Sequence, residues 1–249
     1  MKANLVMDLK KEAARVAYAL IENNSTIGLG DGSAVRSLAG YLIGGIKTGK
    51  NFKLYTSSIT TENVLRDAGL TILDISLADS LDQYYDGCDQ VDTGLNALKS
   101  GSGIHTQEKL LAVMARKFIL LADESKFISI FDPKFPLVLE VLPQARGYVM
   151  KKMKMFFPYS TLSTRVSTEN ADELLLTRNG NHLIDCKFLQ WPEPSNIQSQ
   201  CKSLTGVVDI SLFYQLASDA LIAGNKGIYL YQRKNDLVNL ISQYPLELL

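Results

Sequence analysis

Apolar residues recur at helical spacing from residue 9 to residue 22. Leu9, Ala13, Val16, Ala17 and Leu20 share one face, and charged residues occupy the other faces. This pattern predicts an amphipathic helix. A short apolar run over 26–30 follows and is typical of a buried strand, and a second helical pattern begins after a glycine-rich stretch, over 34–43.

Further apolar runs predict strands over 52–55, 70–76 and 117–122, with helical patterns between them. Strands that alternate with helices favour a doubly wound, mostly parallel, Rossmann-like α/β sheet. Near Phe131 the composition shifts towards proline and β-branched residues, and a hairpin turn at Asn179-Gly180 predicts a smaller inserted α+β domain. Strands over 205–209 and 219–224 are expected to return to the first domain, and 235–244 is expected to add a helix. The predicted domains are 1–130 with 206–249, and 131–205.

Composition narrows the classes of partner. The 249 residues are 46% hydrophobic, and 26 basic residues balance 26 acidic ones, so no global field attracts nucleic acid or an anionic membrane. Three widely spaced cysteines and two histidines suggest neither a disulfide framework nor a metal site. No apolar run approaches the length of a membrane span. We expect a cytoplasmic protein with a small polar ligand.

The glycine-rich stretch Gly28-Leu-Gly-Asp-Gly-Ser33 lies between a predicted strand and a predicted helix. Loop amides and a helix N-terminus that point at one spot form an anion cradle. The spacing differs from that of a dinucleotide fingerprint. Further along, the hydroxyls of Thr56, Ser57 and Ser58 suit sugar or phosphate contacts, or equally the N-cap of the following helix, and both interpretations stay open.

Candidate chemistry concentrates between residues 86 and 109. Three carboxylates (Asp86, Asp89 and Glu108) and the ammonium of Lys99 stand among glycines that permit tight turns. Such a set suits acid–base work on a small polar substrate. Each residue alone is better explained as a turn or cap residue, so the grouping carries the hypothesis.

Read together, these motifs resemble the A-type ribose-5-phosphate isomerase family. In that family Asp-Gly-Ala-Asp-Glu is followed by Lys-Gly-Gly-Gly and then by Glu-Lys. Here Asp86-Gly-Cys-Asp-Gln90, Lys99-Ser-Gly-Ser102 and Glu108-Lys109 keep the order and spacing. The resemblance runs from about Leu9 to Tyr229, nearly the whole chain.

The resemblance implies interconversion of ribose 5-phosphate and ribulose 5-phosphate through an enediol, with no metal or organic cofactor. It implies that Glu108 is the base, that Asp86 helps to open the furanose ring, and that Asp89 and Lys99 position hydroxyls and stabilise the oxyanion. It also implies a homo-oligomer, a dimer or a tetramer. The implied substrate-binding residues are Lys10, Gly30, Asp31, Gly32, Ser33, Ala34, Thr56, Ser57, Ser58, Gly101 and Lys126.

The phosphate loop departs from the family pattern. Gly-Thr-Gly-Ser-Thr of the family is Gly30-Asp-Gly-Ser-Ala34 here, which places a carboxylate where a dianion would bind. Two like charges about 5 Å apart at an effective dielectric constant of about 20 repel by roughly 3 kcal/mol. The glycines after Lys99 are partly serine (Ser100 and Ser102), and a later family glycine is Ser211.

Three functions therefore stay open. The first is isomerisation of ribose 5-phosphate. The second is the same proton transfer on another sugar, unphosphorylated in one version, with Asp31 accepting a hydrogen bond from a terminal hydroxyl. The third is a ligand-binding protein of the same fold without turnover. Retention of all four catalytic candidates argues against the third, and the first is preferred.

Overall fold

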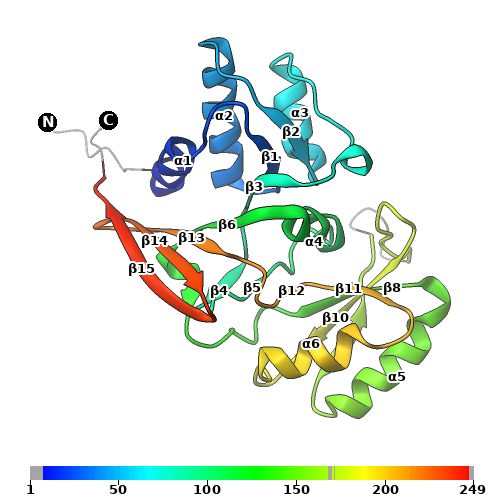
Figure 1. Ribbon diagram of the computed structural model, residues 1–249. Coiled ribbons are helices and arrows are strands. Elements are labelled where there is room, and N and C mark those ends of the chain that lie inside the picture. Colours follow the sequence, from blue (N-terminus) through cyan, green and yellow to red (C-terminus); the bar gives the residue numbers. More distant parts are fainter. Residues whose placement is uncertain (1–7, 168–169, 171, 247–249) are drawn as a thin grey trace, which may run out of the picture. The chain divides into compact units, whose positions relative to one another are not determined.

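The computed structural model describes residues 8–167, 170 and 172–246 (Figure 1). The chain divides into two compact units. The first comprises Met1–Cys88, Leu110–Phe127 and Leu216–Leu249, and the second comprises Asp89–Lys109 and Ile128–Gln215.

The first unit is built around a seven-stranded sheet with the strand order β15-β14-β13-β6-β3-β1-β2. The strands are β1 (Thr26–Leu29), β2 (Lys53–Thr56), β3 (Leu81–Asp86), β6 (Ala115–Asp123), β13 (Asp219–Gly224), β14 (Gly227–Lys234) and β15 (Leu237–Tyr244). The five strands from β2 to β13 are parallel, whereas β14 and β15 pair antiparallel. The predicted α/β class with a mostly parallel sheet is confirmed.

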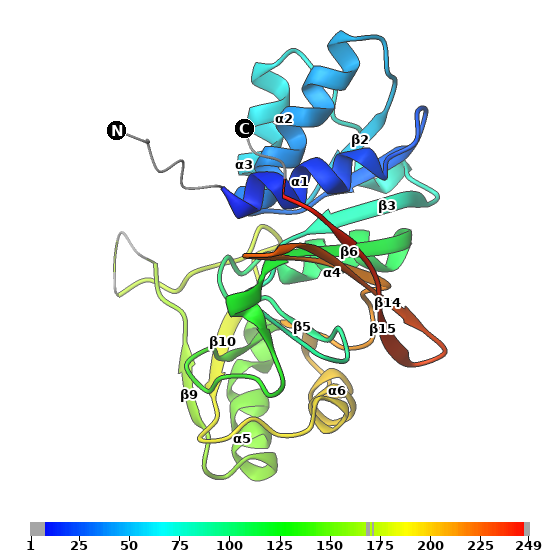
Figure 2. The same ribbon diagram turned by 90° about the vertical axis from the view of Figure 1, so that its left-hand side faces the viewer.

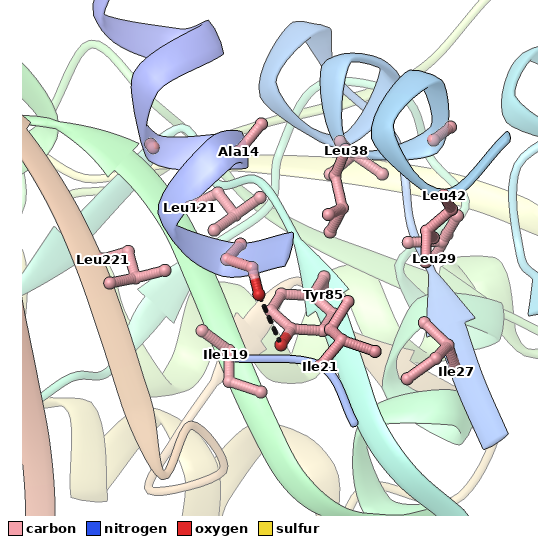
Figure 3. Close-up of a cluster of buried hydrophobic side chains, with 14 of the residues drawn as sticks. Ala14, Ile21, Ile27, Leu29, Leu38, Leu42, Tyr85, Ile119, Leu121 and Leu221 are labelled. Carbon is pink, nitrogen blue, oxygen red and sulfur yellow. Dashed lines mark hydrogen bonds between the residues drawn. The ribbon is translucent and has the colours of Figure 1, made fainter. Parts of the chain in front are cut away.

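Helices α1 (Leu9–Ala19) and α2 (Ser33–Lys47) cover one face of this sheet (Figure 2). The unit also contains α3 (Ile59–Asp67), and α4 (His105–Met114) leads into β6. Leu38 and Leu42 of α2 and Ala14 of α1 join a buried cluster with the strand residues Leu29 and Leu121 (Figure 3). The apolar positions that recur at helical spacing in the sequence are therefore the positions that pack into the core.

The strand order reverses beside β1. The chain passes from β1 through α2 to β2 on one side, and the later strand β3 lies on the other side of β1. Parallel neighbours end at the same edge of a sheet, so the loop after β1 and the loop after β3 lie side by side. Ligands of open α/β sheets bind at such a reversal point.

Two predicted elements of the first unit are wrong. Residues 70–76 form an isolated bridge at Ile72 and a 3-10 turn over Ile75–Leu77, and the strand comes later, as β3. Residues 235–244 form β15 instead of a helix. Asn235 and Asp236 both have positive φ (51° and 63°), which is the conformation of a type I′ hairpin turn, so the chain folds back onto β14.

The second unit has an antiparallel sheet in the order β11-β8-β10-β9 and a small sheet in the order β12-β5-β4-β7. The strands are β4 (Gln90–Asp92), β5 (Ala97–Leu98), β7 (Phe127–Ile128), β8 (Leu137–Val141), β9 (Thr161–Thr164), β10 (His182–Lys187), β11 (Val207–Ile210) and β12 (Leu212–Phe213). The helices are α5 (Arg146–Phe156) and α6 (Pro194–Lys202). Val149 and Met153 of α5 and Ile197 of α6 share a buried cluster with Leu139 and Ile184 of the sheet.

The units differ from the predicted domains at two segments, 89–109 and 206–215, which both belong to the second unit. The strand over 205–209, expected in the first domain, is β11 and pairs with β8. The physical reason is a set of backbone hydrogen bonds. Lys99 N–H donates to Ser211 O (3.0 Å), Ser211 N–H donates to Val138 O (2.8 Å), and β5 pairs with β12.

Across the part of the chain that the structure describes, no helix has the length and apolar character needed to cross a bilayer.

Candidate active site

Asp86 holds the glycine loop that follows β1. Its Oδ1 accepts hydrogen bonds from the backbone N–H groups of Asp31 (3.1 Å) and Gly87 (2.7 Å), and its Oδ2 accepts one from the Tyr84 hydroxyl (2.6 Å). The side chain is fully buried. A Cβ at Gly30 would lie 2.1 Å from the Asp86 carboxyl group, so a glycine is required there. The carboxylate therefore fixes the geometry of the loop.

A cavity of about 40 Å³ opens at the N-terminus of α2. Its lining includes two cations, Lys10 and Lys126, with the loop residues Asp31, Gly32, Ser33 and Ala34. Gly32 is the N-cap residue with φ of 116°, and no side chain caps the helix there. Because the first amides of a helix carry partial positive charge, the cavity is suited to an anion such as phosphate.

The two lysines of the cavity are held by local structure. Asp8 caps α1 by accepting hydrogen bonds from the backbone N–H groups of Lys10 and Lys11, which sets Lys10 in the first turn of that helix. Lys126 Nζ donates to the carbonyl oxygen of Cys88 at 2.7 Å, in the loop after β3. Both cations thus come from segments next to the glycine loop.

The carboxylate of Asp31 has a partner that the sequence analysis missed. Arg36, in the first turn of α2, places Nη1 3.1 Å from Asp31 Oδ1. Both side chains are about one third exposed, at 40% for Arg36 and 32% for Asp31. The carboxylate of Asp31, which stands where the family pattern has a threonine, is thus paired with the guanidinium of Arg36.

The hydroxyls over 56–58 make local hydrogen bonds. Ser58 is the N-cap of α3 and its Oγ accepts from Thr61 N–H (3.2 Å), while Thr56 Oγ1 accepts from Ser58 N–H (3.1 Å). Ser57 Oγ lies 3.4 Å from the Tyr84 hydroxyl oxygen. The capping interpretation of Ser58 is therefore confirmed, and the three residues are not among those that line the cavity at α2. Their contact with substrate stays a prediction.

In the second unit, one peptide segment after Lys99 is held from both sides. Asp89 Oδ2 accepts hydrogen bonds from the N–H groups of Ser100 (2.5 Å) and Gly101 (3.1 Å). Arg165 donates to the carbonyl oxygens of the same two residues and forms an ion pair with Asp185 (2.7 Å). A carboxylate on the N–H side and a guanidinium on the C=O side fix the loop that carries Lys99.

Lys99 and Glu108 form a buried ion pair. Lys99 Nζ lies 3.3 Å from Glu108 Oε1, and the side chains are 8% and 1% exposed. Glu108 belongs to the first turn of α4, and the Lys99 ammonium also faces the ring of Phe213 at 5.9 Å. A carboxylate and an ammonium sheltered from water can take up a proton and stabilise a developing oxyanion.

The start of α4 is anchored by a second buried pair. Lys109 Nζ lies 2.9 Å from Asp209 Oδ1 and also donates to the carbonyl oxygen of Ile210. Burial lowers the pKa of Lys109 to about 8, against the opposing effect of Asp209. Burial also lowers the pKa of His105, in the same turn, to about 3, with the Lys109 ammonium as the second cause. These contacts fix the turn that carries Glu108.

The structure brings several predicted residues into contact. Within the first unit Asp86 contacts the 30–31 loop, and Lys10 and Lys126 line one cavity with that loop; within the second unit Asp89 contacts Gly101, and Lys99 contacts Glu108. Tyr84, Arg36 and Arg165 were not predicted from the sequence. Tyr84 could have been found, because it lies two residues before Asp86 on one face of a strand.

No group of three or more histidine, cysteine, aspartate or glutamate side chains suited to a metal ion occurs among residues 8–167, 170 and 172–246.

Comparison with known proteins identifies the family. The family model of ribose 5-phosphate isomerase A (phosphoriboisomerase A) matches residues 53–227. A ribose-5-phosphate isomerase A from Pyrococcus furiosus is 30% identical over 230 residues, which cover 92% of this chain and 99% of that protein.

Solved structures agree with this result. A D-ribose-5-phosphate isomerase in complex with phospho-erythronic acid has a TM-score of 0.84 and 27% identity, over 91% of this chain and 98% of that chain. Ribose 5-phosphate isomerase A from Methanocaldococcus jannaschii has a TM-score of 0.82 and 26% identity, over 91% and 99% of the two chains. The resemblance drawn from the motifs is confirmed, and the chain belongs to the ribose 5-phosphate isomerase A family.

Proposed function

We propose that the protein interconverts ribose 5-phosphate and ribulose 5-phosphate by moving a proton between C1 and C2 through an enediol. Membership of the family supports this reaction. The single observation that carries the mechanism is the buried pair of Lys99 and Glu108, 3.3 Å apart. It unites the two functions that an aldose–ketose isomerisation needs, which are a base and a stabiliser of oxygen charge.

In this mechanism Glu108 removes the C2 proton of the open-chain aldose. Negative charge then develops on the carbonyl oxygen at C1, where the Lys99 ammonium stabilises it. The C2 hydroxyl proton then passes to the oxygen at C1, which moves the negative charge to the oxygen at C2. Glu108 returns its proton to C1 as the ketone forms at C2. Both groups are preorganised, because Asp89 and Arg165 hold the Lys99 loop and the Lys109–Asp209 pair holds the turn of Glu108.

Asp86 and Asp89 have supporting roles in the proposal. Asp86 assists opening of the furanose ring by accepting the proton of the C1 hydroxyl and passing it to the ring oxygen as the bond between C1 and that oxygen breaks. The substrate hydroxyl would replace one of the hydrogen bonds that Asp86 accepts from Asp31, Gly87 and Tyr84. Asp89 orients substrate hydroxyls with its Oδ1 oxygen, since Oδ2 accepts from the N–H groups of Ser100 and Gly101. Both roles require a hydrogen-bond acceptor, which a carboxylate oxygen provides.

The phosphate end of the substrate is assigned to the cavity at the N-terminus of α2. Lys10 and Lys126 supply positive charge there, and the uncapped amides of the helix supply hydrogen-bond donors. The hydroxyls of Thr56, Ser57 and Ser58 are assigned to contacts with the sugar, alongside the local hydrogen bonds described above. The reaction as proposed uses no metal ion and no organic cofactor.

The protein is further proposed to act in the cytoplasm as a homo-oligomer, a dimer or a tetramer. The cytoplasmic assignment is supported by its three cysteines, Cys88, Cys186 and Cys201, which are all free thiols. The oligomer is supported by the family resemblance of the sequence motifs. Size-exclusion chromatography with light scattering measures the assembly, and a monomer at micromolar concentration would contradict it.

The function is tested by a turnover assay on the purified protein. Ribulose 5-phosphate formation is measured with ribose 5-phosphate, and the same assay is run with other pentose and hexose phosphates and with free ribose. We expect the highest kcat/KM for ribose 5-phosphate. Faster turnover of a free sugar, or no turnover of any sugar phosphate, would refute the proposal.

A further inference from the structure

The charges that line the cavity at α2 do not by themselves favour a phosphate dianion. The two cations, Lys10 and Lys126, are matched by two carboxylates, Asp31 and Asp123. Asp123 is engaged as the cap of a 3-10 turn, where its Oδ1 accepts from Ser125 N–H (3.0 Å). Asp31 lies beside the amides of α2, the same positive end of the helix that would attract a phosphate.

Arg36 changes this balance without lining the cavity. Its Nη1 is 3.1 Å from Asp31 Oδ1, on the first helix after the loop. The backbone of Asp31 is fixed separately, because its N–H donates to Asp86. The ion pair therefore compensates the charge of the Asp31 side chain and holds its direction, while the path of the loop depends on Asp86.

We propose that Arg36 is a specificity-determining residue, which by pairing with Asp31 allows a phosphate loop that contains a carboxylate to accept a phosphorylated sugar. The inference rests on the proposed function, which assigns this loop to phosphate. While the pair is intact, Arg36 compensates the Asp31 carboxylate, so that among the charged side chains lining the cavity the cations Lys10 and Lys126 are opposed by Asp123 alone. A freed Asp31 would also compete with the ligand for the amides of α2.

The pairing predicts that the two residues are coupled. Loss of Arg36 should matter when Asp31 carries its charge and should matter little when it does not, which a double-mutant cycle measures. The variants are Arg36→Gln, Asp31→Asn and the double variant. Asp31→Asn keeps the shape of the side chain and removes its charge, whereas Arg36→Gln removes the charge and shortens the side chain.

For Arg36→Gln alone we expect KM for ribose 5-phosphate to rise about tenfold, with kcat within about twofold, because the loop binds the end of the substrate that does not react. In the Asp31→Asn background the same change should alter KM by less than about threefold. Asp31→Asn alone should lower KM, because it removes a negative charge.

The control is Arg66→Gln. Arg66 forms a comparable pair with Glu62 on α3 (2.7 Å), is exposed, and does not line the cavity. Its loss should leave KM unchanged. Thermal unfolding of each variant shows whether it is folded, and the exposed positions of Arg36 and Asp31 make folding of all variants the expected result.

Calorimetric titration with inorganic phosphate gives a second readout that does not depend on turnover. The same coupling should appear in its dissociation constant. Equal effects of Arg36→Gln in both backgrounds, in either readout, would overturn the inference. If the unmodified protein binds phosphate but does not isomerise ribose 5-phosphate, the proposed function fails. The phosphate titrations of the four proteins still decide whether Arg36 and Asp31 are coupled. If it binds neither, both fail.

Discussion

Glu108 combines nearly complete burial with a cationic neighbour, and its position in the first turn of α4 is fixed by the Lys109–Asp209 pair. Such a carboxylate has little freedom to move and little water to compete with substrate. These properties suit a base whose efficiency depends on geometry.

Glu108→Gln is expected to lower kcat about a thousandfold or more, because the amide keeps the shape and loses the base. KM for ribose 5-phosphate should change much less. The matched control is Glu62→Gln on the surface of α3, which should leave kcat unchanged. Near-normal turnover of the Glu108 variant in a steady-state assay would remove this residue from the mechanism.

His105 predicts a defined acid sensitivity. Burial lowers its pKa from 6.5 to about 3, so the folded protein keeps it neutral over a range in which the unfolded chain binds a proton. Stability is therefore lost as the pH falls below 6.5, by about 1.4 kcal/mol for each pH unit.

His105→Gln should flatten this part of the dependence of unfolding free energy on pH, measured by urea denaturation between pH 7 and pH 4.5. An unchanged slope in the His105 variant would show that this group does not titrate as described.

At the residue scale the sequence grouped side chains that lie in contact in the structure, but it did not indicate their other partners. Lys99 and Glu108 were grouped from motifs of fixed spacing, and they form a buried ion pair. Their catalytic roles stay a prediction. The roughly 3 kcal/mol repulsion at Asp31 was calculated for a carboxylate without a partner. Arg36 lies five residues after Asp31, and the sequence pattern did not indicate that the two side chains would form an ion pair.

The loop between β1 and α2 is the element on which the phosphate assignment depends. Gly30 packs against the carboxylate of Asp86, and Thr61 Oγ1 donates to the carbonyl oxygen of Gly30 (2.8 Å). The loop therefore has contacts on both sides and little room to shift.

Gly30→Ala is expected to reduce the free energy of unfolding by about 1–3 kcal/mol, because the added methyl group overlaps the Asp86 carboxyl group and must displace it. KM for ribose 5-phosphate should rise with it. The control is Gly40→Ala in α2, where a Cβ meets no atom within 4 Å, and where alanine should stabilise the helix by about 0.5–1 kcal/mol. Similar effects of the two changes in chemical denaturation would contradict this account.

At the scale of elements, periodicity succeeded where one face of an element is buried. The predicted helices over 9–22 and 34–43 and the strand over 26–30 correspond to α1, α2 and β1. The 235–244 segment failed because β15 is an edge strand with exposed apolar residues such as Leu237 and Leu240, so it lacks the alternation of a half-buried strand.

For the whole molecule, the assignment of segments to units depended on contacts that no local pattern reveals. The hydrogen bond between Lys99 N–H and Ser211 O joins residues more than one hundred positions apart and draws 89–109 into the second unit. Composition alone marked the start of that unit near Phe131, close to Ile128 where its longer segment begins.

Chelation is expected to affect neither activity nor stability. The described residues offer no cluster of metal ligands, and the proposed proton transfer uses only side chains. The measurement is kcat and the thermal unfolding temperature before and after dialysis against EDTA. Inactivation that added metal reverses would overturn the cofactor-free mechanism.

Proton transfer through an enediol is tested by the incorporation of solvent deuterium. The isomerisation is run in D₂O and followed by proton NMR, with the unmodified protein and with Glu108→Gln. The account predicts that solvent deuterium enters C2 of ribose 5-phosphate and C1 of ribulose 5-phosphate over repeated turnovers, and that the variant loses this incorporation together with turnover. Ribulose 5-phosphate that forms without any solvent deuterium, or incorporation by the variant at the unmodified rate, would contradict it.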